Sequence, residues 1–296
     1  MDVSIIIVNY NTTALTLACL QSIYKHTMAN TFEVIIIDNA SHDESISSVQ
    51  HEFPKTIMIY NAVNVGFGRA NNQGIAASQG KYIFLLNSDT ELTSDAVATF
   101  FDYMEKKANS QVACCGADLI AKDGSPRIAY GNFPSLSEAF SALGFLVLYR
   151  KYFSRHLSSG VYNYSSAIKV VDFLCGADFF IRRSILERTG VFDPEFFLYF
   201  EETELAFRMS KAGYQSILIP EIKIIHHESG SDELHGEYYL QKALVYAKSR
   251  KLYFRKTKGL LAATLINKIY AAQAFIQFCI SRKTNYLSIA KLLLKN

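Results

Sequence analysis

Four short apolar runs, rich in isoleucine and valine, constrain the fold of this 296-residue chain more than any other feature. Each run has the length of a β-strand, and apolar residues at helical spacing follow the first three. Such alternation of strand and helix predicts an α/β fold with a mostly parallel sheet flanked by helices. The expected strands are residues 3–8, 32–37, 56–60 and 81–86, and the expected helices are 12–26, 43–51 and 67–78.

The pattern is looser after residue 89, but further elements are expected. The last 60 residues have the composition of two or three helices rich in tyrosine, lysine and leucine. Because no internal repeat is found, the sequence favours one large domain over residues 1–237 and a helical C-terminal extension over residues 238–296. The further elements are helices at about 93–107 and 201–212, strands at 111–115, 168–174, 178–183, 215–219 and 222–226, and a hairpin near 122–124.

The formal net charge of +3 hides an uneven distribution along the chain. All 27 acidic residues lie at or before Glu237, whereas residues 238–296 contain twelve Lys and Arg and no carboxylate. We expect residues 248–280 to contact an anionic membrane surface, because basic residues precede a mostly apolar stretch there. Lys268, near the middle of that stretch, makes a spanning helix costly. The alternative is a helix that packs on the large domain and keeps its basic face in solvent.

The cysteines and the N-terminus indicate a cytoplasmic protein. None of the five cysteines has the spacing of a zinc site or a CxxC pair, so we interpret them as reduced core thiols. The first residues lack the basic and apolar regions of a signal peptide. We therefore expect a cytoplasmic location, with peripheral attachment to the inner face of the cell membrane.

Polar side chains follow each of the first four predicted strands. In open α/β sheets ligands bind beyond the carboxyl ends of the strands, so these residues are candidates for a binding site. For any single residue the alternative is a helix cap or a turn former, but four such groups at one sheet edge favour a ligand site. The groups are Asn9, Tyr10 and Asn11; Asp38 to Ser41; Asn61 to Asn64; and Asn87, Ser88 and Asp89.

Several motifs occur in a fixed order along the chain. They are SIIIVNYN at residues 4–11, DNASHD at 38–43, NVGFGRANN at 64–72, NSD at 87–89, GVFD at 190–193, FLYFEETE at 197–204 and HHESGS at 226–231. With these motifs the chain resembles the family 2 glycosyltransferases, and within them the rhamnosyltransferase-like enzymes. The resemblance covers about residues 3–231 and leaves the basic extension outside.

The resemblance implies a GT-A fold, in which a nucleoside diphosphate lies over the ends of the first strands. Asp38 matches the carboxylate that accepts a hydrogen bond from the base. We expect Gly66 to let the backbone approach the nucleotide, and Arg69 to bring a positive charge near phosphate. The expected donor-binding residues are Asn9, Asn11, Asp38, Asn64, Gly66, Arg69, Asn72, Asn87, Ser88 and Asp89.

The NSD sequence at residues 87–89 occupies the position of the DxD motif, which holds a divalent cation against the diphosphate. The resemblance makes Asp89 a ligand of Mg²⁺ or Mn²⁺, and His226 matches the histidine that completes the site. Asn87 stands where the motif has its first carboxylate, and a neutral amide weakens metal binding. The alternative for His226 is an ordinary histidine at a strand end.

Three glutamates lie where the family has its catalytic carboxylate. By position Glu202 matches the general base that deprotonates the acceptor hydroxyl, and Glu201 is the second candidate because glutamate is one methylene longer than the family's aspartate. The alternative is that acidic residues favour the start of a helix. We expect Gly176, Ala177 and Glu201 on the acceptor side of the site.

Together these assignments imply an inverting transfer from a dTDP-, UDP- or GDP-sugar to a saccharide or lipid-linked saccharide in cell-surface polysaccharide synthesis. No covalent nucleophile is expected, because the acceptor attacks the donor directly. The alternatives are a nucleotidyltransferase and a non-catalytic nucleotide-sugar-binding protein. NAD binding is not expected, since the glycines follow the third strand and the last glycine of the fingerprint is missing. No nucleic-acid partner is expected either.

Overall fold

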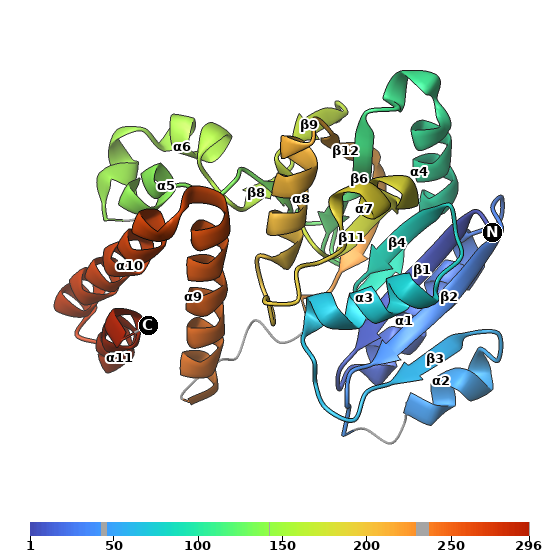
Figure 1. Ribbon diagram of the computed structural model, residues 1–296, viewed down its shortest axis with the longest axis horizontal. Helices are drawn as coiled ribbons and strands as arrows, with labels where there is room; N and C mark the ends of the chain where they lie inside the picture. The colour runs from blue at the N-terminus through green and yellow to red at the C-terminus, as the bar shows by residue number, and fades with distance from the viewer. Residues whose placement is uncertain (43–45, 142, 229–236, 296) are drawn as a thin grey trace.

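The computed structural model describes residues 1–42, 46–141, 143–228 and 237–295. A twisted sheet with helices on its faces forms the larger part, and three C-terminal helices pack beside it (Figure 1). The expected α/β fold with a helical extension is therefore confirmed.

The first half of the sheet is parallel, in the order β3-β2-β1-β4. Runs of isoleucine on its central strands are fully buried between the helix layers, as their composition predicts. The helix predicted at 43–51 is shorter, and residues 43–45 lie outside the described residues. The elements are β1 (Val3–Asn9), α1 (Thr13–His26), β2 (Phe32–Asp38), α2 (Ser47–Glu52), β3 (Ile57–Tyr60), α3 (Phe67–Ala77) and β4 (Tyr82–Leu86).

The second half of the sheet is mixed, because β11 runs antiparallel to both β4 and β6. The two strands predicted at 215–219 and 222–226 form one strand, β12, with a shift of register between Ile219 and Lys223. Pro220 lies at this shift, and a bulge accommodates its missing N–H. The elements are β5 (Thr90–Leu92), β6 (Val112–Ile120), β9 (Lys169–Val171), β11 (Asp178–Arg182) and β12 (Gln215–His226).

A smaller sheet, in the order β10-β7-β8, lies beside the main one. The strand predicted at 168–174 divides at Asp172, so that β9 pairs with β12 whereas β10 joins the small sheet. The predicted hairpin turn is present, since the Gly124 amide donates to the carbonyl of Ala121 at 2.9 Å. The elements are β7 (Ile128–Gly131), β8 (Val161–Tyr162), β10 (Phe173–Leu174), α4 (Ala96–Glu105), α5 (Leu136–Ser141), η3 (Phe145–Leu148), α6 (Arg150–His156), α7 (Arg183–Thr189) and α8 (Glu201–Lys211).

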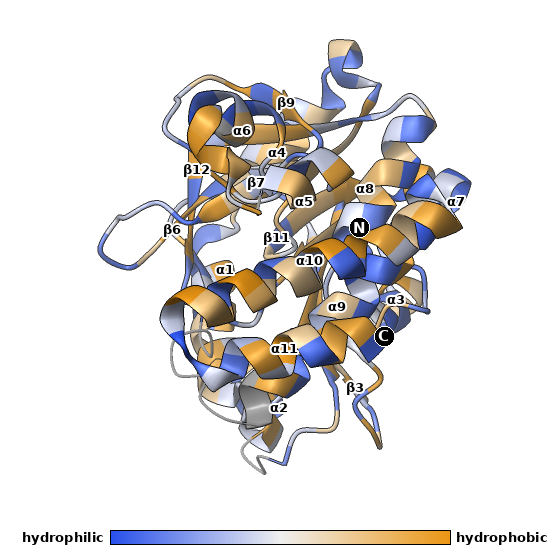
Figure 2. Cartoon of the chain, turned by 90° about the vertical axis from the view of Figure 1, so that its left-hand side faces the viewer, coloured by the Kyte–Doolittle hydropathy of each residue, from blue (hydrophilic) through white to orange (hydrophobic). Residues whose placement is uncertain are grey.

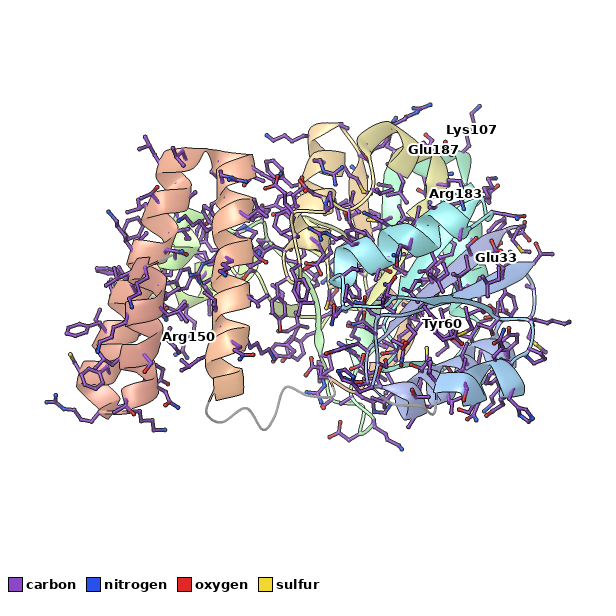
Figure 3. All side chains as sticks on the ribbon, turned by 60° about the horizontal axis from the view of Figure 1, so that its bottom comes forward. Glu33, Tyr60, Lys107, Arg150, Arg183 and Glu187 are labelled. Carbon is purple, nitrogen blue, oxygen red and sulfur yellow. The ribbon has the colours of Figure 1, made fainter. Side chains whose placement is uncertain are left out.

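A second apolar core joins the C-terminal helices to the sheet domain. Phe196 and Phe200, which precede α8, pack with Tyr253, Phe254 and Ile266 of the extension, and all five are buried. Figure 3 shows side chains filling the space between α9 and the sheet domain. The three helices are α9 (Glu237–Lys258), α10 (Leu260–Ser281) and α11 (Thr284–Lys295).

Part of the basic cluster in the extension is used within the protein. Arg255 pairs with Glu195 at 2.7 Å, and Lys256 pairs with Asp193 at 2.7 Å. The expectation that this cluster as a whole faces lipid is therefore wrong for these two residues, because loop carboxylates of the sheet domain neutralise them. Within the described ranges, no helix is long and apolar enough to cross a membrane.

Candidate active site

The ends of β1 and β2 are joined by a buried polar network. The Asn9 side-chain amide donates to Asp38 Oδ1 at 2.9 Å, and the Ser41 hydroxyl donates to the same oxygen at 2.6 Å. Asn11 has a left-handed backbone (φ 56°), and its amide donates to Ser41 Oγ at 2.9 Å. The network fixes the Asp38 carboxylate at the sheet edge, where the sequence predicts it.

A row of asparagines continues this edge toward α3. The Asn39 side-chain amide donates to Asn64 Oδ1 at 2.9 Å, and Asn39 Oδ1 accepts from the backbone amide of Val65 at 3.0 Å. Asn64 Oδ1 also accepts from the amide of Gly66 at 2.9 Å. These bonds hold the loop before α3 against the end of β2.

Gly66 is also required for the packing of a neighbouring loop. Its backbone (φ 91°, ψ 162°) is in a region that is essentially restricted to glycine, and an added Cβ would lie 2.4 Å from the Phe197 carbonyl oxygen. The neighbouring Phe67 amide donates to that same carbonyl at 2.8 Å. The close approach is thus to the loop before α8, and it docks this loop on the start of α3.

Arg69, which the sequence predicts near phosphate, and Asn72, another expected donor-binding residue, bind the loop before α8. Arg69 Nε donates to the Pro194 carbonyl at 2.6 Å. Asn72 exchanges two hydrogen bonds with the backbone of Phe192, at 2.8 and 3.1 Å. Neither lines the cavity described next, so their expected donor contact is not supported by their position.

A cavity of about 230 Å³ opens at the carboxyl ends of β1, β2 and β4. Five of the predicted donor-binding residues line it, together with seven others, of which Tyr10 and Asn39 belong to the polar groups expected at the strand ends. The predicted residues are Asn64, Gly66, Asn87, Ser88 and Asp89; the others are Val8, Tyr10, Thr12, Asn39, Phe67, Phe197 and Leu198. Asn9, Asn11 and Asp38 do not line the cavity. They lie behind the lining residues and hold them in place through hydrogen bonds such as that from Thr12 to Asn9 at 3.1 Å.

Asp89 and His226 lie side by side, as expected for a shared metal. Strand β12 runs antiparallel to β5 with His226 opposite Thr90, which brings His226 Nε2 to 3.4 Å from Asp89 Oδ1. Both side chains are largely buried, and the His226 Nδ1 and Asn87 Oδ1 atoms have no hydrogen-bond partner among the described residues. The next histidine, His227, points to Glu91 at 2.7 Å.

These residues fit a divalent cation that takes its remaining ligands from a substrate. A carboxylate, an imidazole and an unpaired amide oxygen are all acceptable ligands, and Mg²⁺ commonly uses few protein groups together with phosphate oxygens. No group of three or more His, Cys, Asp or Glu that could hold a metal occurs among the described residues. A cation here would therefore depend on the diphosphate for its coordination.

Helix α8 begins with three glutamates in different environments. It starts after Tyr199 and Phe200, which have consecutive left-handed backbones (φ 70° and 67°) that the core around Phe200 holds in place. Glu204 accepts two hydrogen bonds from Arg208, at 2.8 and 3.0 Å, and Arg208 also binds the carbonyl of Val191 at 2.7 Å. Glu204 is therefore part of the support for the loop before α8.

Glu201 and Glu202 are adjacent carboxyl groups with raised pKa values. Glu201 is only 2% exposed and its Oε2 has no partner among the described residues; burial, and then repulsion from Glu202, raise its pKa well above the ordinary value. Burial also raises the pKa of Glu202, which accepts a hydrogen bond from the Thr203 hydroxyl at 3.1 Å. Glu202 differs in lining a second cavity of about 100 Å³, and this access makes it the better candidate for a base.

Gly176 and Ala177 connect the two sides of the site. A Cβ at Gly176 would lie 3.4 Å from Glu202 Cγ, so the glycine packs directly on the proposed base. The Ala177 carbonyl accepts from the Asn87 amide at 2.9 Å, beside Asp89. The second cavity also includes Tyr246 of α9, which no motif indicated because it lies outside the resemblance.

The protein has a mixed sheet, a polar cavity at the ends of its parallel strands, and an acidic helix start beside that cavity. This arrangement is the GT-A type fold of glycosyltransferases. Solved glycosyltransferases share it. GalNAc-T7 with UDP, GalNAc and Mn²⁺ aligns with a TM-score of 0.60 at 15% identity, over 95% of this chain and 57% of that chain. Mannosyltransferase PcManGT from Pyrobaculum calidifontis, in complex with GDP-Man and Mn²⁺, aligns with a TM-score of 0.56 at 14% identity, over 99% and 84%.

Sequence comparison gives the family. The profile described as Glycosyl transferase family 2 matches residues 4–190, and the chain belongs to this family. An N-acetylglucosaminyl-diphospho-decaprenol L-rhamnosyltransferase of Mycobacterium tuberculosis is 23% identical over 212 residues, 67% of each chain. Rhamnosyltransferase WbbL of Escherichia coli is 28% identical over 171 residues, 55% of this chain and 61% of its own. The protein is a rhamnosyltransferase-like glycosyltransferase.

Proposed function

We propose that this protein is an inverting, metal-assisted glycosyltransferase that moves a sugar from a nucleoside-diphosphate sugar to a lipid-linked saccharide. The proposal rests on two cavities that lie on either side of residues 176–177. Asp89 lines one cavity, and Glu202 lines the other. An inverting displacement needs a leaving-group site and a base on opposite sides of the reacting carbon. We propose that residues 1–237 form the transferase domain, which contains the leaving-group site and the base, and that residues 238–296 form an extension.

On the acceptor side Glu202 would take the proton of the attacking hydroxyl. Its raised pKa suits this role, because a carboxylate that binds a proton more strongly is a better base as long as it is ionised. Glu201, buried beside it, is the second candidate for this role. Gly176 lies next to the Glu202 side chain.

On the donor side the cavity would hold the nucleoside diphosphate. Hydrogen bonds would hold the side chains of Asp38 and of the asparagines at the strand ends in position for it. Asp89 and His226, with Asn87 beside them, would hold Mg²⁺ or Mn²⁺. When bound, the cation supplies positive charge to the departing diphosphate. Solved glycosyltransferases that contain Mn²⁺ with UDP or GDP-Man support this assignment.

The acceptor class is proposed from the relatives and from the surface of the extension. The mycobacterial relative is named for a diphospho-decaprenol acceptor. Helix α10 presents apolar residues at helical spacing on its outer face: Leu261 is 89% exposed and Ile280 is 74% exposed, while Lys268 is also exposed. In Figure 2 this helix and α11 cross the face nearest the viewer; α10 is mostly orange, whereas α11 alternates orange with blue. Such a face suits the interface of an anionic membrane.

The membrane part has its own test. The full chain should sediment with anionic vesicles, and Leu261→Glu should weaken binding, whereas Met28→Glu, an equally exposed site outside the extension, should not. Equal loss in both variants, or binding that ignores lipid charge and salt, would contradict the proposed contact.

The catalytic proposal is tested by a panel of nucleotide sugars. We expect one of the dTDP-, UDP- or GDP-sugars to raise the melting temperature of the purified protein with Mn²⁺ or Mg²⁺, because a ligand that binds the folded state alone stabilises it. A chelator should remove the effect. Stabilisation that is independent of divalent metal would contradict the assignment of Asp89 and His226.

A further inference from the structure

The three helices of the extension enclose a cavity of about 350 Å³. Its walls are mostly apolar and include Ala247, Ala274 and Leu293. Two cationic side chains, Lys242 and Arg250 of α9, also line it. An apolar cavity with cations at its wall is suited to an amphiphile whose anionic group adjoins a hydrocarbon chain.

Arg250 is a buried cation whose hydrogen bonding is incomplete. It is 6% exposed, its Nε has no hydrogen-bond partner among the described residues, and no ion pair in the described part of the chain includes it. Its guanidinium lies 3.7 Å from the centre of the Tyr270 ring and donates to Asn267 Oδ1 at 3.3 Å. Burial lowers the pKa of Arg250, whereas the nearby Tyr270, Tyr246 and Glu138 side chains oppose this effect.

The position of Tyr246 connects this cavity to the proposed base. Tyr246 lines the cavity of the extension and also the small cavity that contains Glu202. Its ring lies 5.9 Å from the Arg250 guanidinium and packs at 5.4 and 5.1 Å against Tyr199 and Phe200, which precede Glu201. One aromatic ring thus separates the base from the buried cation. Figure 1 shows α9 lying between α8 and α10, as this connection requires.

We propose that the cavity between α9, α10 and α11 binds the lipid-diphosphate part of the acceptor. Arg250 and Lys242 would bind the diphosphate, the apolar walls would take the first isoprenoid units, and the attached sugar would lie against Tyr246 with its hydroxyl at Glu202. This assignment rests on the proposed transferase function and names the acceptor class that the site fits.

A purely structural role for Arg250 explains less. Contact of the guanidinium with the rings of Tyr246 and Tyr270 would join α9 to α10. It would not account for the unpaired Nε, nor for a second cation, Lys242, at the same cavity. The binding role and the purely structural role of Arg250 predict different affinities of Arg250 variants for an anionic amphiphile.

The experiment measures binding of farnesyl diphosphate to the full-length protein by isothermal titration calorimetry. Farnesol and inorganic pyrophosphate serve as probes that lack the anion and the hydrocarbon, respectively. The variants are Arg250→Met, Lys242→Met, which changes a partly exposed residue and is expected to fold, and Lys248→Met, an exposed control on α9 outside this cavity.

We expect farnesyl diphosphate to bind more tightly than either partial probe. Loss of a charged hydrogen-bond donor should weaken binding about 10- to 100-fold in Arg250→Met and several-fold in Lys242→Met. Lys248→Met should bind like the natural protein. Equal binding of pyrophosphate and farnesyl diphosphate, equal binding of farnesol, or unchanged affinity in Lys242→Met and Arg250→Met would overturn the proposal.

Failure of the transferase function would be seen separately. UDP, GDP and dTDP are titrated with Mn²⁺ into the same samples, which reports on the donor cavity alone. Nucleotide binding without farnesyl diphosphate binding would refute the lipid-diphosphate subsite and leave the transferase proposal. Farnesyl diphosphate binding that depends on Arg250, in a protein that binds none of the nucleotides, would support the subsite and contradict the donor assignment.

Discussion

The buried carboxyl of Glu201 should make the stability of this protein depend on pH in a defined direction. Because burial and Glu202 raise its pKa above the ordinary value of 4.5, the folded state keeps a proton that the unfolded state releases. Stability therefore falls as pH rises from the unfolded pKa toward the folded one, by about 1.4 kcal/mol per pH unit for one proton. Glu201→Gln removes this titration while keeping the shape of the side chain.

The measurement is urea unfolding at several pH values between 5 and 8 (roughly one pH unit apart). We expect Glu201→Gln to gain stability relative to the natural protein as pH rises, with the gain levelling off once Glu201 ionises in the folded state. Glu187→Gln, an exposed carboxyl on α7 labelled in Figure 3, controls for the loss of one surface charge. If the curves of the natural protein and Glu201→Gln stay parallel over this range, the account of Glu201 as a buried, protonated group is refuted.

Three further predictions concern the donor side and the packing of the extension. Asp89→Ala should abolish transfer and weaken nucleotide-sugar binding chiefly in Mg²⁺ or Mn²⁺, whereas Asp102→Ala, an exposed control, should not; near-normal turnover of Asp89→Ala would contradict the metal assignment. Gly66→Ala should cost about 1–3 kcal/mol in urea unfolding, because its Cβ meets the Phe197 carbonyl in a glycine-only conformation; a neutral effect would show that the loop moves freely. Phe254→Ala should lower stability by about 3–5 kcal/mol, and a loss below 1 kcal/mol would mean that the extension does not share a core with the sheet domain.

The parallel half of the fold could be predicted from sequence because its strands are continuous apolar runs. The isoleucine runs within residues 3–8 and 32–37 predict burial on both faces of the sheet, and these isoleucines are buried. The short strands β7 and β8 could not be predicted, since two to four residues carry no periodicity, and no sequence signal divides residues 168–174 between two sheets. The sequence predicts two strands on either side of Pro220, a residue that is disfavoured inside a strand, but Pro220 lies at a shift of register within the single strand β12.

The candidate site could be predicted where it depends on residues close in sequence. The NSD sequence at 87–89 lies at the end of β4 as expected, and five predicted donor residues line one cavity. Arg69 was assigned to phosphate because a free cation near glycines is typical of such a loop, but its partner, the carbonyl of Pro194, is 125 residues away. Tyr246 could not be found, because only tertiary packing brings α9 to Glu202.

The central claim is that Glu202 is the base in a transfer from a nucleotide sugar. The most direct measurement is the acceptor-dependent release of nucleoside diphosphate, with Mn²⁺ present, by the natural protein, Glu202→Gln and Glu201→Gln. We predict that Glu202→Gln lowers turnover by about 10²- to 10⁴-fold with nearly unchanged donor affinity, whereas Glu201→Gln retains most of its activity. Near-normal turnover of Glu202→Gln, or a loss of that size in Glu201→Gln alone, would contradict the account.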